Sequence, residues 1–502
     1  MEEKKIDINS IIGFILIFGI LVWIMYQNQP DPKVVAAEKA QKELVLKAQK
    51  AKELANKAVE KATVAVATGD STQLVALQKT LGNFAYSATL PSAKNDFTTI
   101  ENEVIKLKIA NKGGYIAEAT LKNFEKFKKG SGQLVELIKN NNANLNIVLQ
   151  TNDNRTLNTK DLFFEPTLTK IGADQVLSMK LKSGPNSFLE YKYIVKPNDY
   201  MIGFDVRSQG LNQVLNTAKP LDLEWDLKAF RNEKSISYEN KYTEIYFEHK
   251  EGKVDYAGLG AKEEETLEKP TFIAFKQHFF TSILVSKTPF EKAQLVSTNL
   301  MNDEKVDTTF TKSFKANLPL AFTNGELDYK LNWYLGPSDY KTLASYDQNL
   351  EKIITLGWGI IGWINRFIFV PLFGFLGSYI DYGIAIILFT ILIKLAMSPI
   401  TFKSFLSQAK MKVLRPEIAE LGEKFKKDPM KKQQETMKLY NKAGVNPMAG
   451  CIPALIQLPF MMASFQFFPA AIELRQKGFL WADDLSSYDS ILKLPFNIPF
   501  YG

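Results

Sequence analysis

The sequence predicts an α+β multi-pass membrane protein, with a large antiparallel β-sandwich outer domain and an α-helical membrane core that carries a cytoplasmic helical hairpin. Three observations predict this class. Uncharged apolar runs long enough to cross a bilayer occur near the N-terminus and again in the C-terminal third. Between about residues 97 and 345, apolar and polar residues instead alternate with the period of two that half-buried strands show. Residues 401–446, between two apolar runs, hold eleven Lys or Arg and five Asp or Glu.

The first apolar run, Ile11–Tyr26, follows Lys4 and Lys5. A cleaved signal peptide is the alternative, but no small-x-small cleavage site directly follows the run, which favours an uncleaved transmembrane anchor over residues 1–30. Residues 31–96 form a charged region rich in Ala, Lys and Glu. They suit a charged helix rising from the anchor, and a disordered linker is the alternative.

The outer domain is expected over residues 97–345. Ile105 and Leu107, for example, alternate with lysines, and the stretch FLEYKYIVKPNDYMIGFDV alternates around an Asn198-Asp199 turn. Many such strands separated by turn signals are typical of an antiparallel sandwich.

Two histidines are the candidate general bases of this domain, His249 and His278. Neither has a nucleophile motif or a phosphate-binding loop beside it, so we interpret both as structural or surface residues and expect no enzyme. With these two histidines and the single Cys451, the sequence also predicts no metal site and no cofactor.

The membrane core is expected to begin with a transmembrane helix over residues 380–402. From Tyr382 to Phe402 the only ionisable side chain apart from the tyrosine is Lys394. A cation inside a membrane segment costs roughly 2.5–3.5 kcal/mol, so it normally faces protein, water or a partner. Lys394 is therefore the first candidate functional residue. A second transmembrane helix is expected over residues 447–470, which carry no charge.

The positive-inside rule places the basic residues 403–446 in the cytoplasm. With the N-terminus also cytoplasmic, residues 97–345 and 471–502 lie outside. The remaining apolar run, Ile353–Gly377 within residues 346–379, carries Asn365 and Arg366. If it also crossed the membrane, the basic loop would end outside, so we expect an interfacial amphipathic helix there.

The basic loop itself predicts two helices. Pro416 suits the first position of one helix, Asp428 and Pro429 suit the N-cap and first position of the next, and Gly444 can end it. This helical hairpin could be a solvated loop whose lysines only set topology. Alternatively, it could be a mobile element that binds anionic lipids or a client chain.

Three stretches identify a resemblance to a known family: QAKMKVLRPEIAELGEKFKKD, MKLYNKAGVNPMAGCIPALIQLPF and AIELRQKGFLWADDLS. They resemble the YidC/Oxa1/Alb3 membrane protein insertases, and the large outer domain and N-terminal anchor are similar to the YidC form of Gram-negative bacteria. YLGPSDYKTL and FKQHFFTSILV are similar too. The pattern NP-x-x-GC-x-P-x-x-x-Q-x-P around Asn446–Pro459 is the most specific of these signals.

The resemblance implies a bacterial inner-membrane protein with a periplasmic β-sandwich and a hydrophilic groove that is open to the cytoplasm and the lipid. It places Lys394 where the family carries its groove cation, most often an arginine. Thr390 and Ser398 lie one helical turn on either side, and Gln457 of the next helix could join them as client-contacting residues. Snorkelling of Lys394 toward the cytoplasmic headgroups is the structural alternative. The chain is expected to be C-terminally incomplete, because the family core continues through three more helices.

The implied function is that of a membrane protein insertase and chaperone acting alone or with the Sec translocon. Its expected partners are nascent membrane proteins, the Sec translocon, the ribosome and anionic lipids, with no specific nucleic acid sequence. The main alternative is a membrane-anchored periplasmic binding module with no insertase activity. A solute transporter using Lys394 is a third hypothesis, although no inverted repeat supports it.

Overall fold

The computed structural model describes residues 71–249, 252–426, 428–444 and 452–488. The predicted anchor over residues 1–30 and most of the charged region 31–96 lie outside the described residues. Residues up to Thr80 form one unit and those from Leu81 a second. The first unit contributes most of helix α3 (Ser71–Leu81), and the short helices η2 (Gly82–Phe84) and α4 (Ala85–Ala88) open the second.

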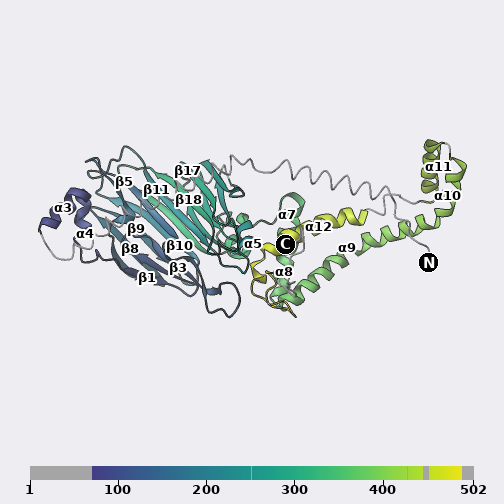
Figure 1. Cartoon of the computed structure of the whole chain (residues 1–502), viewed down its shortest axis with the longest axis horizontal. Helices are drawn as coiled ribbons and strands as arrows, with labels where there is room; N and C mark the ends of the chain where they lie inside the picture. The colour runs from purple at the N-terminus through teal and green to yellow at the C-terminus, as the bar shows by residue number, and fades with distance from the viewer. Residues whose placement is uncertain (1–70, 250–251, 427, 445–451, 489–502) are drawn as a thin grey trace. The chain divides into compact units, whose positions relative to one another are not determined.

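The described part from residue 97 to 337 forms three antiparallel sheets (Figure 1). The four-stranded sheet has the order β1 (Phe97–Glu101), β2 (Ile105–Ala110), β3 (Ile116–Glu125), β4 (Leu134–Ile138). The nine-stranded sheet has the order β13 (Lys253–Ala257), β12 (Glu244–His249), β15 (Phe272–Lys276), β16 (Phe280–Ser286), β19 (Asp328–Pro337), β10 (Met201–Gln209), β9 (Phe188–Val195), β8 (Asp174–Lys182), β7 (Glu165–Ile171). The six-stranded sheet has the order β14 (Lys262–Glu268), β17 (Lys292–Asn299), β18 (Phe310–Leu320), β11 (Leu221–Phe230), β5 (Ala143–Gln150), β6 (Thr156–Asn158). The short helices η3 (Thr159–Asp161) and α5 (Ile236–Lys241) lie between strands.

The two large sheets pack face to face, as aromatic contacts between them show. Trp225 of β11 stacks on Phe275 of β15, with ring centroids 3.7 Å apart, and meets Trp333 of β19 edge-on at 4.7 Å. All three side chains belong to one buried apolar cluster that draws on every sheet. The predicted antiparallel β-sandwich is therefore confirmed.

In these strands the apolar residues of the alternating pattern are buried and the polar residues between them are more exposed, as predicted. In β2 the apolar residues Ile105 and Leu107 are buried and the lysine between them is exposed. The predicted turn at Asn198-Asp199 joins β9 to β10, where the main chain of Asn198 takes a φ of 48°. Strands β15 and β16 are buried along their whole length, since both faces of the sheet are covered there.

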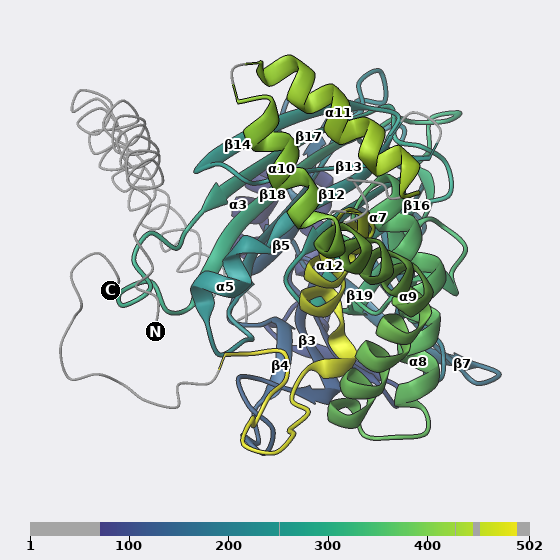
Figure 2. The ribbon, with the colours of Figure 1, turned by 90° about the vertical axis from the view of Figure 1, so that its right-hand side faces the viewer.

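The chain continues from the sandwich into helices (Figure 2). The segment that the sequence assigns to an interfacial helix contains η4 (Leu350–Ile353), α7 (Gly359–Ile364), the π-helical turn η5 (Asn365–Phe369) and α8 (Val370–Gly377), preceded by α6 (Tyr340–Ala344). By length and composition, Gly359–Gly377 could also cross a membrane, as could Tyr382–Val413. The interfacial position of the first of these stays a prediction.

Helix α9 (Tyr382–Val413) is longer than the transmembrane helix predicted over residues 380–402. The polar stretch after Phe402 contains no glycine or proline, so the helix continues until Arg415-Pro416 starts α10 (Arg415–Lys424). Asp428 caps α11 (Pro429–Lys442) as predicted, because its carboxylate accepts a hydrogen bond from the Lys431 amide (3.0 Å). Gly444 follows the last turn with a φ of 61°, which favours glycine.

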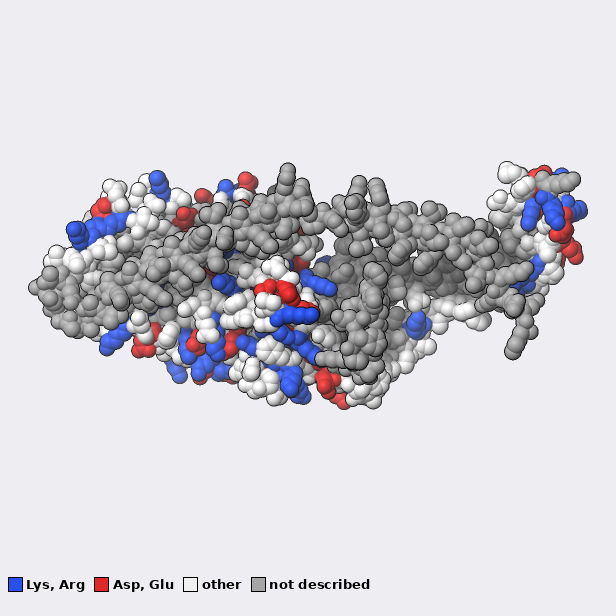
Figure 3. Space-filling view, in the orientation of Figure 1, with Lys and Arg blue, Asp and Glu red and all other residues white. Residues whose placement is uncertain are grey.

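Helices α10 and α11 lie side by side and form a helical hairpin (Figure 2). Lys, Arg, Asp and Glu gather over it in Figure 3, whereas the visible surface of α9 leading to it is mostly white. The last described elements are α12 (Ile452–Ala470), which contacts both α7 and α9, and η7 (Ile472–Leu474).

A second buried cluster joins the outer face of the nine-stranded sheet to the helices. It contains Tyr246 and Phe272 from the sheet, Phe369 from η5, Phe389 from α9 and Phe467 from α12. This second cluster therefore packs the helical segment against the outer face of the nine-stranded sheet.

Candidate functional site

A cavity of about 210 Å³ that is open on one side lies between the apolar helices α9 and α12. Thr390 and Lys394 of α9 and Gln457 of α12 lie on its wall, together with Ser464. The structure thus brings together three of the four residues that the sequence predicts as client-contacting. Ser398 is exposed one turn further along α9 and is not part of this wall.

Aromatic and apolar side chains form the rest of the cavity: Phe369, Phe389, Ile393, Met397, Phe460, Met461, Phe465 and Phe468. Lys394 is exposed, and within the described ranges no carboxylate lies at ion-pair distance from its ammonium group. The Thr390 hydroxyl donates to the Ile386 backbone oxygen (2.8 Å). Its oxygen can still accept a hydrogen bond, so the wall offers one cation, one amide and hydroxyl groups among aromatic rings.

Asn365 fixes the position of α12 beside α7. Its Nδ2 donates to the backbone oxygens of Leu356 (2.8 Å) and Ala463 (3.0 Å), and the side chain is fully buried. Aromatic rings complete this junction, with Phe369 edge-on to Phe389 at 4.7 Å and Phe373 edge-on to Phe467 at 5.3 Å. In the sequence, Asn365 signals only a break in an apolar segment, whereas in the structure it is the polar link between two helices.

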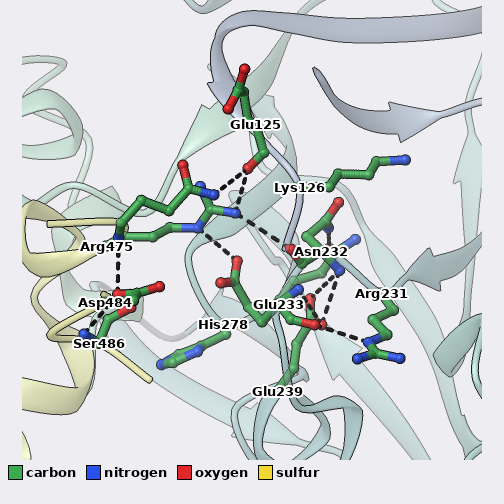
Figure 4. A network of polar contacts seen from close by, with 12 residues as sticks. Glu125, Lys126, Arg231, Asn232, Glu233, Glu239, His278, Arg475, Asp484 and Ser486 are labelled. Atoms are coloured by element: carbon green, nitrogen blue, oxygen red, sulfur yellow. Dashed lines mark hydrogen bonds and ion pairs between the residues drawn. The ribbon is translucent and has the colours of Figure 1, made fainter. Parts of the chain in front are cut away.

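A second polar cluster connects the end of α12 to the sandwich (Figure 4). Arg475, with only 2 % of its side chain exposed, donates from Nε to Glu233 Oε1 (2.8 Å) and from Nη2 to the backbone oxygens of Glu125 (2.7 Å) and Asn232 (3.4 Å). Its guanidinium group also lies over the Phe280 ring. No sequence signal predicts this cluster, because Arg475 and Glu233 are 242 positions apart.

Glu239 supports this cluster from within the sandwich. Its carboxylate accepts hydrogen bonds from the backbone amides of Asn232 (3.0 Å) and Glu233 (3.1 Å). Burial, and then repulsion by Glu233, raise the pKa of Glu239 to about 8. Burial also raises the pKa of Glu233, although the Arg475 guanidinium opposes that shift.

The two histidines have structural surroundings, as predicted. His278 is buried, stacks on Tyr242 and Phe279, and places Nε2 2.8 Å from the Pro469 backbone oxygen at the end of α12. Burial lowers its pKa to about 3, so the ring is neutral at physiological pH. His249 is largely buried, and its Nε2 lies 3.9 Å from Asp255 Oδ2. Among the described residues, no group of three or more His, Cys, Asp or Glu side chains could hold a metal ion.

Family models match nearly all of the chain after the charged region. The model described as YidC periplasmic domain matches residues 98–371, and the model described as 60Kd inner membrane protein matches residues 373–501.

Curated relatives match over nearly the whole chain. A protein of Parabacteroides distasonis named "Membrane protein insertase YidC" is 34 % identical, and the match covers 99 % of this chain and 80 % of the relative. A protein of Bacteroides fragilis with the same name is 35 % identical over 99 % of this chain and 79 % of the relative. A solved structure described as "Active YidC insertase crystal structure with the first transmembrane domain resolved" is matched at 16 % identity and a TM-score of 0.30, over 78 % of this chain and 76 % of that chain. On the family models and the curated relatives, the chain belongs to the YidC family.

Proposed function

We propose that this chain is a membrane protein insertase and chaperone of the inner membrane, and that the cavity between α9 and α12 receives the client segment. The observation that supports this site is the meeting of Thr390, Lys394 and Gln457 on one wall between two apolar helices. The relatives' names support the function, and none of those reported above supports the alternative of a binding module without insertase activity.

Insertion needs no covalent chemistry, but a client must carry polar groups through an apolar layer. Such groups are costly in hydrocarbon and far less costly where they meet a charge or a hydrogen-bonding group. Lys394 supplies a fixed positive charge, and the described carboxylates leave it unpaired. An acidic residue on the client's translocated flank can therefore be its transient partner.

The proposed orientation follows from the distribution of charge. The basic segment 403–446, which contains α10 and α11, lies in the cytoplasm, the sandwich lies in the periplasm and the N-terminus is cytoplasmic. In this arrangement the helical hairpin is positioned to meet anionic headgroups, the ribosome or an emerging client. The Sec translocon is the proposed partner within the membrane.

The decisive experiment reverses the charge at residue 394. We expect Lys394→Glu to impair insertion of clients with an acidic translocated flank much more than Lys394→Arg does, in cells depleted of their own insertase. Ser398→Ala should have little effect, because Ser398 does not line the cavity. Lys410→Glu is the matched control, since it makes the same charge change on the same helix away from the cavity.

Snorkelling makes the opposite prediction. If the ammonium group of Lys394 only reached the cytoplasmic headgroups, Lys394→Glu and Lys410→Glu should have the same effect. Equal insertion by the Glu and Arg variants at position 394 would remove the proposed role of the cavity charge. Site-specific photocrosslinking from positions 394 and 457 to a stalled nascent chain tests the contact itself.

A further inference from the structure

A short hairpin after α12 exposes two large apolar side chains at its tip. Leu480 and Trp481 are 76 % and 75 % exposed. The flanking residues close the hairpin, since the Phe479 amide donates to the Ala482 oxygen (2.8 Å) and the Ala482 amide donates to the Phe479 oxygen (3.0 Å). Leu480 and Trp481 belong to neither buried apolar cluster, so no part of the chain that the structure describes covers this tip.

The backbone of the tip would suit glycine better than leucine. Leu480 has a φ of 54°, whereas Trp481 does not have a positive φ. A two-residue hairpin loop with a positive φ at its first position only is of type II′, in which glycine normally takes that position. A large apolar residue in this place therefore points to a role for its side chain and not for the turn alone.

Close packing fixes the hairpin on the first turn of α9. A Cβ atom on Gly383 would lie 2.0 Å from the Phe479 ring, so the ring rests directly on the helix backbone. Leu480 and Trp481 follow Phe479 by one and two residues. Their Cα atoms therefore lie within about 8 Å of the Phe479 Cα, at ~3.8 Å per residue.

The apolar run of α9 sets the level of the tip in a bilayer. From Tyr382 to Phe402 the helix spans about 30 Å at ~1.5 Å per residue, which is roughly one hydrocarbon core. The inference rests on the proposed crossing of the membrane by α9. In that crossing, Tyr382 lies at the bilayer boundary on the side of the sandwich, because the sandwich and α8 precede it. The hairpin packs on the next residue, Gly383, and so lies at the same boundary.

An open hollow of about 790 Å³ lies beside the tip, and Leu480 borders it. Lys129, Lys477, Asp381 and Asp483 line this hollow, so cations and carboxylates balance and no anionic lipid is required. Headgroups and water satisfy such polar groups, whereas hydrocarbon does not. A polar hollow beside an apolar tip therefore matches the change from headgroups to acyl chains across the bilayer interface.

We propose that Leu480 and Trp481 insert into the interfacial layer of the leaflet on the side of the sandwich. Indole and phenol rings are enriched at this level of a bilayer, and Tyr379, exposed just before α9, adds a second ring there. The lipid is the occupant because the apolar surface continues from the tip onto the exposed residues Ile384 and Ile387 of α9. The tip then fixes the depth of the segment after α12, and this role does not depend on Lys394.

The test is depth-dependent fluorescence quenching of the full chain in phosphatidylcholine vesicles. A fluorophore is attached to Trp481→Cys in a Cys451→Ser background, and the lipid carries a nitroxide either near the headgroup or near the end of the acyl chain. The label at position 481 should lose most of its fluorescence with the shallow nitroxide and clearly less with the deep one. Iodide in the water should quench it weakly.

Lys219→Cys is the matched control. Lys219 is exposed just before β11 (Leu221–Phe230), whose other end leads to the Arg475 cluster. At ~3.3 Å per residue, this ten-residue strand holds the control label about 33 Å from that cluster. The control should be quenched by iodide and by neither lipid.

A third label separates this proposal from the crossing on which it rests. Leu392 is 42 % exposed and lies ten residues after Tyr382, about 15 Å into the bilayer at ~1.5 Å per residue. Its label should be quenched best by the deep nitroxide. If Leu392 is quenched in this way but position 481 responds like Lys219, the tip proposal alone is overturned. If neither label responds to the lipids, the crossing of α9 is overturned as well.

Two further results bear on the occupant and on the attachment. A label at position 481 that is shielded from both nitroxides and from iodide would overturn the lipid in favour of a second copy of the chain, the only other protein present. Gly383→Val should reduce the quenching at position 481, because the new side chain would overlap the Phe479 ring and displace the hairpin. Lys394→Glu should leave the quenching at position 481 unchanged, whatever its effect on insertion.

Discussion

Replacing Arg475 by methionine should detach the segment after α12 from the sandwich. The methionine keeps an apolar stem against Phe280 but removes the guanidinium group, which is almost fully buried. Two of the three groups that accept hydrogen bonds from Arg475 also accept one from a second donor, which the substitution leaves in place. The Glu125 oxygen also accepts from Gln476 Nε2 (2.9 Å), and the Asn232 oxygen also accepts from the Phe127 amide (2.8 Å).

The magnitude is therefore set by Glu233, whose buried carboxylate loses its cation. Removing one partner of a buried ion pair costs roughly 3–5 kcal/mol. At about 1.4 kcal/mol for each factor of ten, this corresponds to a roughly 10²- to 10⁴-fold larger population of the detached state. The cost should be smaller at pH 5 than at pH 8, because a protonated Glu233 carries no charge and burial already raises its pKa.

Hydrogen exchange of the full chain measures this population. The amides of Phe479 and Leu485 donate to the Ala482 and Lys477 oxygens within the segment, so their exchange reports its local opening. Lys477→Met is the matched control, since Lys477 is exposed and has no ion pair among the described residues. Glu233→Gln combined with Arg475→Met should cost clearly less than the sum of the two single changes.

Two results would refute this reasoning. One is equal exchange in Arg475→Met and Lys477→Met, which would mean that the buried pair does not hold the segment. The other is strict additivity in the double variant, which would mean that Glu233 and Arg475 do not act on each other.

The remaining predictions concern pH and helix packing. Glu239, whose pKa is raised from 4.5 to about 8, contributes stability that is fully present below pH 4.5 and is lost as the pH rises through 8. The pKa of His278 is lowered from 6.5 to about 3, so the stability that this residue contributes decreases as the pH falls below 6.5. The effects of Glu239 and His278 therefore oppose each other below pH 6.5. As the pH rises, the thermal midpoint of the sandwich should fall mainly between pH 6.5 and 8. Glu239→Gln should flatten this fall, and an unchanged slope would contradict the assignment. Asn365→Leu removes the hydrogen bonds to Leu356 and Ala463 and should destabilise the pairing of α7 and α12 by about 0.6–1.7 kcal/mol in mixed-micelle unfolding. An unaltered unfolding midpoint would show that the aromatic contacts alone hold these helices.

Local patterns in the sequence predict much of this fold. The alternation at Ile105 and Leu107, the turn at Asn198 and the cap at Asp428 each depend on neighbours within a few residues, and each occurs as expected. The order of the strands depends instead on distant pairs. Strand β19 pairs with β10 and β16, for example, and no local signal specifies those partners.

The difference between local and long-range contacts also explains which residues of the candidate site the sequence predicts. Thr390 and Lys394 share a face because helical spacing places them one turn apart, and Gln457 was predicted to join them from the next helix. Ser398 lies at the same spacing but does not line the cavity, which helical spacing alone does not predict. The contacts of Arg475 with Glu233 and of Asn365 with Ala463 join segments far apart in the chain, so the sequence alone shows these two residues only as polar side chains.

Pro399 gives α9 a point at which it can bend. A proline inside a helix has no amide hydrogen to donate to the preceding turn, which here begins beside Lys394. The fourteen residues from Ile400 to Val413 form an arm of about 21 Å at roughly 1.5 Å per residue. A change of about 20° at the proline would move the end of that arm by about 7 Å, given that length. A bend at Pro399, which lies within two helical turns of Lys394, would therefore move the start of the helical hairpin relative to the charge at the cavity.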